Sequence, residues 1–367
     1  MAKLGEVCLL KAGKFVSAND ISPEYNKGLY PCFGGNGIRG YVADYTHDGE
    51  FPLIGRQGAL CGNVNLASGK FHATEHAVVV QPKIEMNVHW LYYALNAMNL
   101  GQYATGAAQP GLAVSKLETL SIEIPNISEQ NKIAQTLYKV EQLVNFRKQQ
   151  LAKLDELVKA RFVEMFGDCK TNPKNWKTKA LEKIANVGSS KRVFVEELQD
   201  SGIPFYRGTE IGALAEKKAV IPALFITEEH YKQLCETTGK PQKGDLLMPS
   251  ICPDGRIWIV DTDQPFYFKD GRVLWVHLTS ANYNSVFLLY TLKDRIMTDY
   301  ASIASGTTFA ELKIFALKKC KIFDVSLELQ NQFANFVERV DQQKQTVQQS
   351  LEKFELMKKA LMQEYFG

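Results

Sequence analysis

Apolar residues recur at steps of three and four along two long stretches of the chain, 130–167 and 330–367. In the first stretch the recurring positions run from 133 to 165 and carry Ile, Leu, Val, Val, Arg, Leu, Leu, Val, Arg and Met. In the second they run from 333 to 365 and carry Phe, Val, Val, Lys, Val, Leu, Phe, Lys, Leu and Tyr. A spacing of 3.5 residues favours two helices that pair as a coiled coil. The alternative is that each helix packs only on its own domain.

The two stretches are copies of one another at an offset of 200 residues. Aligned without gaps, they share 13 of 38 positions, and both end in Phe-Gly. Neither contains proline, or glycine before its last residue, and their composition favours helix. Ser128 is the expected N-cap of the first helix, and Gly167 is its expected C′ residue. The segments before them do not obviously align, so the chain reads as two unlike domains, each followed by a copy of one helix.

This arrangement predicts four sections of chain: a first domain at 1–127, a first helix at 128–167, a second domain at 168–327 and a second helix at 328–367. The two ends of a domain usually lie close together. The second helix should therefore begin near the end of the first and run antiparallel to it. The pair would form a rod of roughly 55 Å, at 1.5 Å per residue, with a pseudo-twofold axis across it.

The positions that recur at steps of three and four form the seam along which the two helices would pair. The charged residues within this seam predict how the helices are aligned. With flush ends, each cation faces an apolar residue: Arg147 faces Leu351, Arg161 faces Val337, Lys344 faces Leu154 and Lys358 faces Val140. A shift of one heptad would instead bring Lys344 against one of the two arginines, which disfavours the shifted pairings. We therefore expect Leu151 to lie near Val347, and Leu154 near Lys344.

Both globular segments contain short β-type runs that are broken by Gly, Asn, Asp and Pro, such as "FPLIGRQGALCGNV" and "GDLLMPSI". Helical segments intervene, among them "NVHWLYYALNAMN" and "SVFLLYTLKDRIMTDYASI". This mixture predicts the α+β class, with two compact domains that are each built around a twisted sheet.

Composition and charge narrow the class of protein. The 367 residues are 45% hydrophobic and 23% charged, with a net charge of +3, which is ordinary for a globular protein. Residues 1–127 carry nine Lys and Arg against ten Asp and Glu, and 168–323 carry 22 against 18, so basic residues must act locally in any contact with DNA. The seven cysteines form no Cys-x-x-Cys pair, which argues against a zinc ribbon. With no signal peptide and no membrane-length apolar run, we expect a cytoplasmic protein.

Three short motifs resemble catalytic signatures but lack the context that the chemistry requires. "FGGNG" (33–37) matches an S-adenosylmethionine loop, but the β-type sequence after it favours a turn between strands. "NPKNW" (172–176) resembles the clamp of amino-methyltransferases with a second proline replaced and one residue inserted. "HATEH" (72–76) matches an inverted zinc-protease motif, but its flanks are strand-like, which would put His72 and His76 on one face of a strand. We expect no catalytic residues, no cofactor and no metal.

Polar residues in the glycine-rich turns have the chemistry to contact DNA. Arg pairs with guanine, Asn and Gln pair with adenine, and Asp or Glu pairs with cytosine, whereas Lys, Ser and Thr suit phosphates. Each residue taken alone is more often a solvated turn residue. The candidates are Asn36, Arg39, Arg56, Gln57, Asn63, Asn65, His72, Ser190, Lys191, Arg192, Arg207, Thr209, Glu210, Ser250, Asp254, Arg256, Lys269 and Arg272.

Nearly the whole chain resembles the specificity subunit of Type I restriction–modification systems. The phrases that carry the resemblance are "YPCFGGNGIRGYV", "FPLIGRQGALCGNVN", "HATEHAVVV", "GAAQPGLAVSKLETLSIEIPNISEQNKIA", "MFGD" with "NPKNW", "IPFYRGTEI" and "KGDLLMPS". The resemblance implies two target recognition domains separated by two antiparallel helices, with each domain reading one half of a split double-stranded DNA site. It also implies a non-catalytic subunit that binds two methyltransferase subunits and that restriction subunits can join.

One departure from the family pattern concerns a loop that occurs in both domains. The "GAAQPGL" of the first domain (106–112) becomes "GTTFAEL" in the second (306–312), which removes the Gln-Pro and puts equivalent loop contacts in doubt. The alternative function is a stand-alone DNA-binding or assembly module of another restriction or phage-defence system. A methyltransferase or zinc protease acting alone is a further alternative, and it predicts a bound cofactor or metal.

Overall fold

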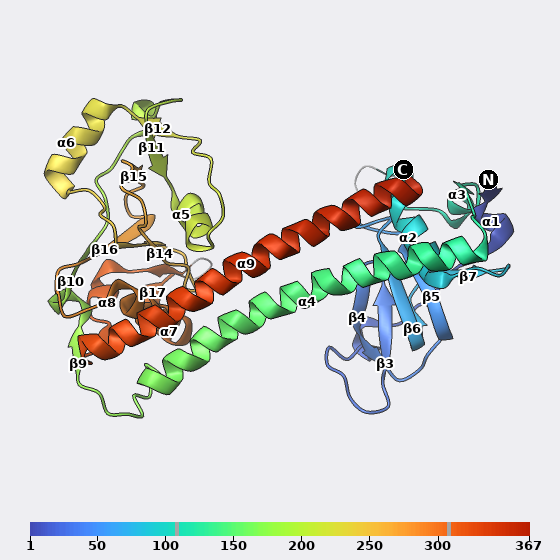
Figure 1. Ribbon diagram of the computed structural model, residues 1–367, viewed down its shortest axis with the longest axis horizontal. Helices are drawn as coiled ribbons and strands as arrows, with labels where there is room; N and C mark the ends of the chain where they lie inside the picture. The colour runs from blue at the N-terminus through green and yellow to red at the C-terminus, as the bar shows by residue number, and fades with distance from the viewer. Residues whose placement is uncertain (107–109, 307–309) are drawn as a thin grey trace. The chain divides into compact units, whose positions relative to one another are not determined.

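A computed structural model describes residues 1–106, 110–306 and 310–367 of the chain (Figure 1). The chain divides into two compact units, the first formed by Met1–Leu151 with Thr346–Gly367, and the second by Ala152–Gln345. Both units combine helices with sheets, which confirms the predicted α+β class. Two 40-residue helices, α4 (Ile127–Phe166) and α9 (Leu327–Phe366), each contribute one section to each unit.

The first unit is built on a six-stranded sheet. Its strand order is β2 (Cys8–Ala12), β7 (Ala77–Pro82), β5 (His47–Gly55), β6 (Val64–Ala73), β3 (Tyr30–Gly34) and β4 (Gly37–Val42). All neighbours are antiparallel except β3 and β6. The smaller elements are β1 (Ala2–Lys3), α1 (Leu4–Val7), η1 (Ala18–Asp20), α2 (Val88–Ala97), η2 (Leu100–Tyr103), α3 (Val114–Glu118) and β8 (Ser121–Ile122). The main core lies between this sheet, α2 and the start of α4, around Ile54, Val80 and Trp90.

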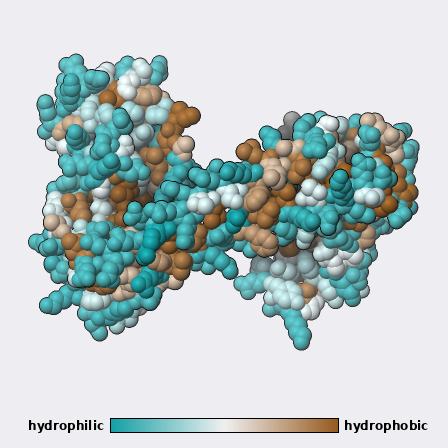
Figure 2. All heavy atoms as spheres, in the orientation of Figure 1, coloured by the Kyte–Doolittle hydropathy of each residue, from teal (hydrophilic) through white to brown (hydrophobic). Residues whose placement is uncertain are grey.

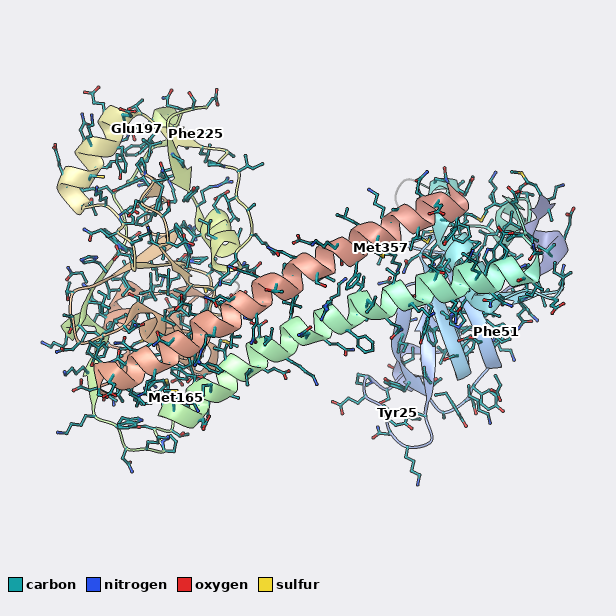
Figure 3. The ribbon with its side chains drawn as sticks, in the orientation of Figure 1. Tyr25, Phe51, Met165, Glu197, Phe225 and Met357 are labelled. Atoms are coloured by element: carbon teal, nitrogen blue, oxygen red, sulfur yellow. The ribbon has the colours of Figure 1, made fainter. Side chains whose placement is uncertain are left out.

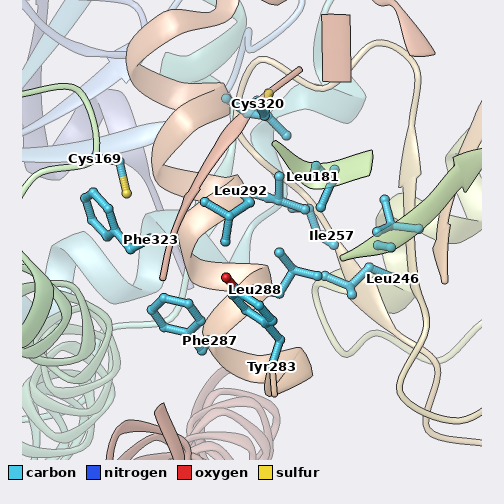
Figure 4. Packing of buried hydrophobic residues seen from close by; sticks show 14 of the residues in the cluster. Cys169, Leu181, Leu246, Ile257, Tyr283, Phe287, Leu288, Leu292, Cys320 and Phe323 are labelled. Atoms are coloured by element: carbon cyan, nitrogen blue, oxygen red, sulfur yellow. The ribbon is translucent and has the colours of Figure 1, made fainter. Parts of the chain in front are cut away.

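The second unit contains a four-stranded and a three-stranded sheet. The first has the order β10 (Ala185–Gly188), β16 (Val273–Leu278), β13 (Leu246–Pro249) and β14 (Trp258–Ile259), and the second β12 (Phe225–Ile226), β11 (Ile203–Tyr206) and β15 (Tyr267–Phe268). Helix α7 (Ser285–Ile303) packs its Phe287, Leu288 and Leu292 into the core shown in Figure 4. The remaining elements are β9 (Thr178–Ala180), η3 (Leu181–Lys183), η4 (Val195–Glu197), α5 (Gly208–Ala215), α6 (Glu228–Thr238), β17 (Ala304–Ser305), β18 (Glu311–Leu312), α8 (Ile314–Lys318) and β19 (Lys321–Phe323).

The two units share a framework that their sequences do not reveal. The order β2-β7-β5-β6 of the first corresponds to the order β10-β16-β13-β14 of the second, and each of these pairs is antiparallel in both. A strand near the start of each unit pairs with a strand just before a long helix, β1 with β8 and β9 with β19. The unlike domains inferred from sequence therefore differ in their loops and insertions, while the framework that carries them is repeated.

The ends of α4 show one wrong prediction and one confirmed one. The prediction that Ser128 caps this helix is wrong, because Asn126 lies at the N-terminus and its Oδ1 accepts a hydrogen bond from the Glu129 amide at 3.0 Å. Asn is at least as good an N-cap as Ser, and here it comes first. Gly167 is confirmed as the C′ residue, with φ of 84° and its amide donating to the Val163 carbonyl at 2.8 Å.

The "NPKNW" segment closes the C-terminal end of α4. Trp176 Nε1 donates to the Phe166 carbonyl oxygen at 2.9 Å, and Lys174 Nζ donates to the Glu164 carbonyl oxygen at 2.6 Å. These carbonyls belong to the last turn of the helix, which has no partners of its own for them. The residues that resemble a methyltransferase clamp therefore satisfy a helix end.

Within the first unit, the section 127–151 of α4 and the section 346–366 of α9 form part of the predicted seam. Val144 and Leu351 are both buried. Lys358 Nζ binds Glu141 at 2.6 Å, one position from the valine that it was predicted to face. Arg147 Nε donates to Ser350 Oγ at 3.1 Å, again one position from the predicted partner. The two sections therefore run antiparallel in the predicted register.

Within the second unit, the sections 152–166 and 327–345 complete the seam. The ring of Phe333 packs against those of Phe162 and Phe166, with centroids 5.4 and 5.6 Å apart. Met165, which is labelled in Figure 3, is buried in the same core. Lys344 forms an ion pair with Asp155, the neighbour of its predicted partner Leu154. These sections are also antiparallel, so the helices pair in each unit rather than packing only on their own domains.

Candidate nucleic-acid interface

The Gln-Asn pair that opens each helical repeat positions the framework of its unit. In the first unit, Gln130 is 2% exposed, and its Oε1 accepts a hydrogen bond from the Asn87 amide at 2.9 Å. Its Nε2 donates to the Pro125 carbonyl oxygen at 2.9 Å, and Asn131 Oδ1 accepts from Asn87 Nδ2 at 2.7 Å. Asn87 is the N-cap of α2, so these contacts fix the start of α2 against the start of α4.

The second unit repeats these contacts with the equivalent residues. Gln330 is fully buried, its Oε1 accepts from the Asn284 amide at 2.9 Å, and its Nε2 donates to the Val325 carbonyl oxygen at 2.9 Å. Asn331 Oδ1 accepts from Asn284 Nδ2 at 2.9 Å, and Asn284 is the N-cap of α7. We call each set of contacts a Gln clamp. The sequence shows the repeated Gln-Asn but not its asparagine partners Asn87 and Asn284, which lie 43 to 47 residues away.

In the first unit, three turns meet beside the ends of β5 and β6. The turn that follows β3 confirms that "FGGNG" joins two strands. It packs so closely on β5 that a Cβ on Gly55 would lie 2.0 Å from the Gly35 carbonyl oxygen. Asn63 Nδ2 donates to Asn36 Oδ1 at 2.9 Å, and the Arg56 amide donates to the His76 carbonyl oxygen at 3.0 Å. The structure therefore brings these candidate residues together from distant parts of the sequence.

The other candidates of the first unit lie around the same turns. Arg39 is exposed and extends over Gly34, where an added Cβ would meet the arginine Cδ at 2.5 Å. Gln57 is exposed and its backbone forms a bridge with Gly111. Asn65 is half-buried on β6, and a Cβ on Gly37 would lie 3.3 Å from its Oδ1.

Several polar atoms in this region are buried without a hydrogen-bond partner among the described residues. They are Arg56 Nε, Asn65 Nδ2, His72 Nδ1, Thr74 Oγ1 and Glu75 Oε2. Buried polar groups are nearly always paired in folded proteins, and each exception needs an explanation. Among them, Arg56 Nε and Asn65 Nδ2 are donors, the type of group that pairs with phosphate oxygens and with acceptors on base edges.

The strand expected through "HATEH" is interrupted. Strand β6 ends at Ala73 and β7 begins at Ala77, so the prediction that His72 and His76 share a strand face is wrong. The reason is a turn after Thr74, whose carbonyl accepts from the Ala77 amide at 3.0 Å. His72 Nε2 lies 3.2 Å from the Lys14 carbonyl oxygen. Within 1–106, 110–306 and 310–367, no three His, Cys, Asp or Glu side chains are placed to hold a metal ion.

In the second unit, one group of candidates surrounds β15. Ser190 Oγ donates to the Phe268 carbonyl oxygen at 2.5 Å, and the Lys191 amide donates to the Tyr267 hydroxyl at 3.1 Å. Lys269 Nζ donates to the Val193 carbonyl oxygen at 3.3 Å. These contacts tie the segment after β10 to β15 and leave Lys191 exposed.

A second group of candidate residues lies at the N-terminal end of α5. Arg207 donates to both carboxylate oxygens of Glu210, at 3.2 and 2.8 Å, and Thr209 Oγ1 donates to the same carboxylate at 2.9 Å. Burial alone would raise the pKa of Glu210, but the hydrogen bonds from Arg207 and Thr209 outweigh it and lower the pKa to about 2. Glu210 is therefore an ionised acceptor that holds the Arg207 guanidinium in place.

A third group lies around the end of β13. Ser250 is only 2% exposed, and its amide donates to the Arg272 carbonyl oxygen at 2.9 Å. Arg256 pairs with Asp254 at 2.8 Å, and Arg272 forms an ion pair with Glu311. The carboxylates occupy part of the donor set of these arginines, so a contact with DNA would use their remaining N–H groups or replace the carboxylate.

The candidate cations therefore fall into two classes. Within the described part of the chain, Arg39, Arg56, Lys191 and Arg192 form no ion pair with a carboxylate, whereas the remaining candidates that carry positive charge do. In Figure 2 much of the visible surface is hydrophilic, with hydrophobic residues in separate patches. In the altered loop, Gln109 of the first domain and residues 307–309 of the second lie outside the described residues.

Comparisons with known proteins agree with this arrangement. The family model described as "Type I restriction modification DNA specificity domain" matches residues 1–156 and 173–356. The EcoprrI specificity subunit of a type I restriction enzyme from Escherichia coli is 53% identical over 143 residues, which are 39% of this chain and 36% of that subunit. A Haemophilus influenzae protein assigned as a type I restriction enzyme specificity subunit is 27% identical over 86% of this chain and 80% of its own length.

Solved structures share the fold. The S subunit of a type I restriction–modification system from M. genitalium has a TM-score of 0.64 at 18% identity, covering 100% of this chain and 95% of that one. A chain from a structure of type I restriction–modification complex assembly has a TM-score of 0.57 at 15% identity, covering 100% and 96%. No helix in the described residues is long and apolar enough to cross a membrane.

Proposed function

This chain belongs to the Type I restriction modification DNA specificity family, and we propose that each of its two domains reads one half of a bipartite site on double-stranded DNA. The observation that carries the proposal is the repeated framework. Two sheets of matching strand order and two Gln clamps hold loops of different sequence. A like framework with unlike loops suits two different half-sites, because base readout depends on the side chains that the loops present.

We assign the recognition domains to 1–127 and 168–327, and the spacer helices to 128–167 and 328–367. In this proposal α4 and α9 set the separation of the two half-sites. Support comes from the length of both helices, which continue for 40 residues, and from the seam contacts within each unit. A helix rises 1.5 Å per residue, so a change of helix length would change the spacer between half-sites and leave the half-sites themselves unchanged.

The helical repeat also supports a partner that docks twice. Leu157 and Met357 occupy the same position of the repeat and are 47% and 48% exposed (Figure 3 labels Met357). Because these exposed positions are repeated, a protein that contacts one of them could contact the other in the same way. We propose that these copies are methyltransferase subunits, that restriction subunits can join them, and that this subunit works in the cytoplasm without catalytic residues or a cofactor of its own.

Co-expression with the cognate methyltransferase subunits, followed by methylation-sensitive genome sequencing, tests the proposal. The expected result is a motif of two different half-sites separated by unread base pairs. Replacing 1–127 with the matching domain of another specificity subunit should change one half of the motif and leave the other half intact. A continuous motif, or a change in both halves after the swap, would contradict the assignment.

A further inference from the structure

Two exposed phenylalanines occupy equivalent places in the two units. Phe15 is 75% exposed and follows β2, and Phe194 is 52% exposed and follows β10. These strands form the same edge of the matching sheet orders, and each segment leads into a short 3₁₀ helix, η1 or η4. The correspondence is not visible in the sequence, where Phe15 comes three residues after the end of its strand and Phe194 comes six residues after.

In the first unit, the backbone that carries Phe15 is held firmly. The Gly13 and Lys14 amides donate to the Ala77 and Ala73 carbonyl oxygens at 3.0 and 2.9 Å. A Cβ on Gly13 would lie 2.1 Å from the Ala73 carbonyl oxygen, so the segment lies directly against the end of β6. The Nε2 of His72, a candidate DNA contact, lies 3.2 Å from the Lys14 carbonyl oxygen. The exposed ring therefore projects from a fixed base.

In the second unit, the segment before Phe194 is held in a similar way. Lys269, also a candidate DNA contact, donates to the Val193 carbonyl, just as His72 contacts that of Lys14. Val193 itself is 1% exposed and anchors the segment in the core. The guanidinium of Arg192 lies over the Phe194 ring, 5.5 Å from its centroid. Each unit thus presents an aromatic ring beside exposed basic residues, next to the candidate interface.

We propose that Phe15 and Phe194 insert at base steps of the bound DNA, one ring at each half-site, while Lys14, Lys191 and Arg192 contact the flanking phosphates. The proposal rests on the DNA-binding function proposed above. An apolar side chain wedged between base pairs partly unstacks them and kinks the duplex. Insertion would bury the exposed ring against the bases, on which it can stack. The neighbouring cations would neutralise the charge of the flanking phosphates.

This insertion adds specificity that hydrogen bonds to base edges do not supply. Pyrimidine–purine steps unstack and kink more easily than other steps. The recognised half-sites should therefore favour such a step at the position where each ring enters. The kink would also change the direction of the duplex at each half-site.

Tryptophan substitution tests the insertion in the assembled complex with methyltransferase subunits. The variants are Phe15→Trp and Phe194→Trp, with Phe146→Trp as a matched control, because Phe146 is 59% exposed and lies on α4, outside the candidate interface. The probe is a duplex that carries the motif methylated by the wild-type complex. Stacking on DNA bases should quench the fluorescence of the tryptophans at positions 15 and 194. The DNA-dependent quenching of these two variants should therefore exceed that of the wild-type complex, which reports only the native tryptophans. The control variant should show the same quenching as the wild type.

Two outcomes would overturn the insertion while leaving DNA recognition intact. One is normal binding and methylation with no DNA-dependent change at positions 15 and 194. The other is a change that occurs on addition of the methyltransferase subunits and not on addition of DNA, which would identify a protein contact instead. A complex that methylates no split motif would contradict the proposed function itself, so the two failures are distinguishable.

Alanine variants give a second readout that does not depend on fluorescence. Phe15→Ala and Phe194→Ala should each weaken binding about fivefold or more, as loss of one stacked base does, with an unchanged salt dependence. Lys14→Ala should lower the salt slope by roughly one, because it removes a phosphate contact. End-labelled duplexes should show a smaller bend with the Phe variants by energy transfer. An unaltered bend with both alanine variants would refute insertion.

Discussion

Replacing the central glutamine of each Gln clamp tests how the repeat holds its domain. Leucine keeps the approximate size of glutamine but has no polar atoms. Gln130→Leu leaves the Asn87 amide and the Pro125 carbonyl without their partner. Gln330→Leu removes three hydrogen bonds, because the Asn284 amide and the carbonyls of Asn282 and Val325 all lose their partner.

The magnitude follows from the cost of buried polar groups. An unsatisfied buried donor or acceptor costs about 1–3 kcal/mol, and carbonyls are less sensitive than amides. We therefore expect Gln130→Leu to lower the free energy of unfolding by about 2–4 kcal/mol, and Gln330→Leu by somewhat more. That is a large share of the roughly 5–15 kcal/mol that stabilises a typical domain.

Urea unfolding followed by circular dichroism measures the loss, and amide hydrogen exchange locates it. Exchange should accelerate at the start of α2 in Gln130→Leu and at the start of α7 in Gln330→Leu, each in its own unit. Gln149→Leu is the matched control, because Gln149 is also identical in both repeats but is exposed. Equal stability of wild type and Gln330→Leu, or equal losses in Gln149→Leu, would refute the reasoning.

Three further predictions concern single contacts. Glu141→Lys should weaken helix pairing by placing a cation beside Lys358, and the charge swap with Lys358→Glu should recover about 0.5–1 kcal/mol of coupling in a double-mutant cycle of unfolding energies. Additive effects would contradict the pair. The pKa of Glu210 is lowered from 4.5 to about 2, so its ionised form stabilises the fold above about pH 4.5, and this contribution is lost as pH falls toward 2. The stability difference between wild type and Glu210→Gln should shrink over that range, and a constant difference would argue against it. Gly167→Ala should cost about 1–2 kcal/mol or more in thermal unfolding, because φ is 84° and the new Cβ would lie 2.8 Å from a Pro173 carbon. Gly188→Ala, which has free space, should be near neutral, and similar effects at both sites would count against the strain argument.

The helices were largely predictable because their signal is local and periodic. The 3.5-residue spacing and the 200-residue offset identify α4, α9 and the seam, and the charged seam residues limit the register. The capping error at Ser128 has a local cause as well, since both Asn126 and Ser128 fit the same signal. Helix α7 was likewise readable from its long run without glycine or proline.

The repeated framework and the Gln clamps could not be predicted in the same way. Strand order depends on contacts between distant segments, and short β-type runs carry little information about their neighbours. Gln130 looks like any helix-surface residue until α2 is placed beside it. The ion pair of Arg272 with Glu311 has the same origin, because 39 residues separate the partners. The sequence therefore identifies candidate DNA contacts by residue type, but it does not show which of them already form ion pairs with carboxylates.

Lengthening both helices by one heptad tests the central claim most directly. Seven residues are inserted between Gln149 and Gln150 and between Gln348 and Gln349, which face one another in the predicted register, so the seam stays in phase. Seven residues add about 10.5 Å, roughly three base pairs of B-DNA. Methylation-sensitive sequencing of the complex with its methyltransferase subunits should show the same two half-sites separated by two to three more base pairs. An unchanged spacer, or altered half-sites, would contradict the account.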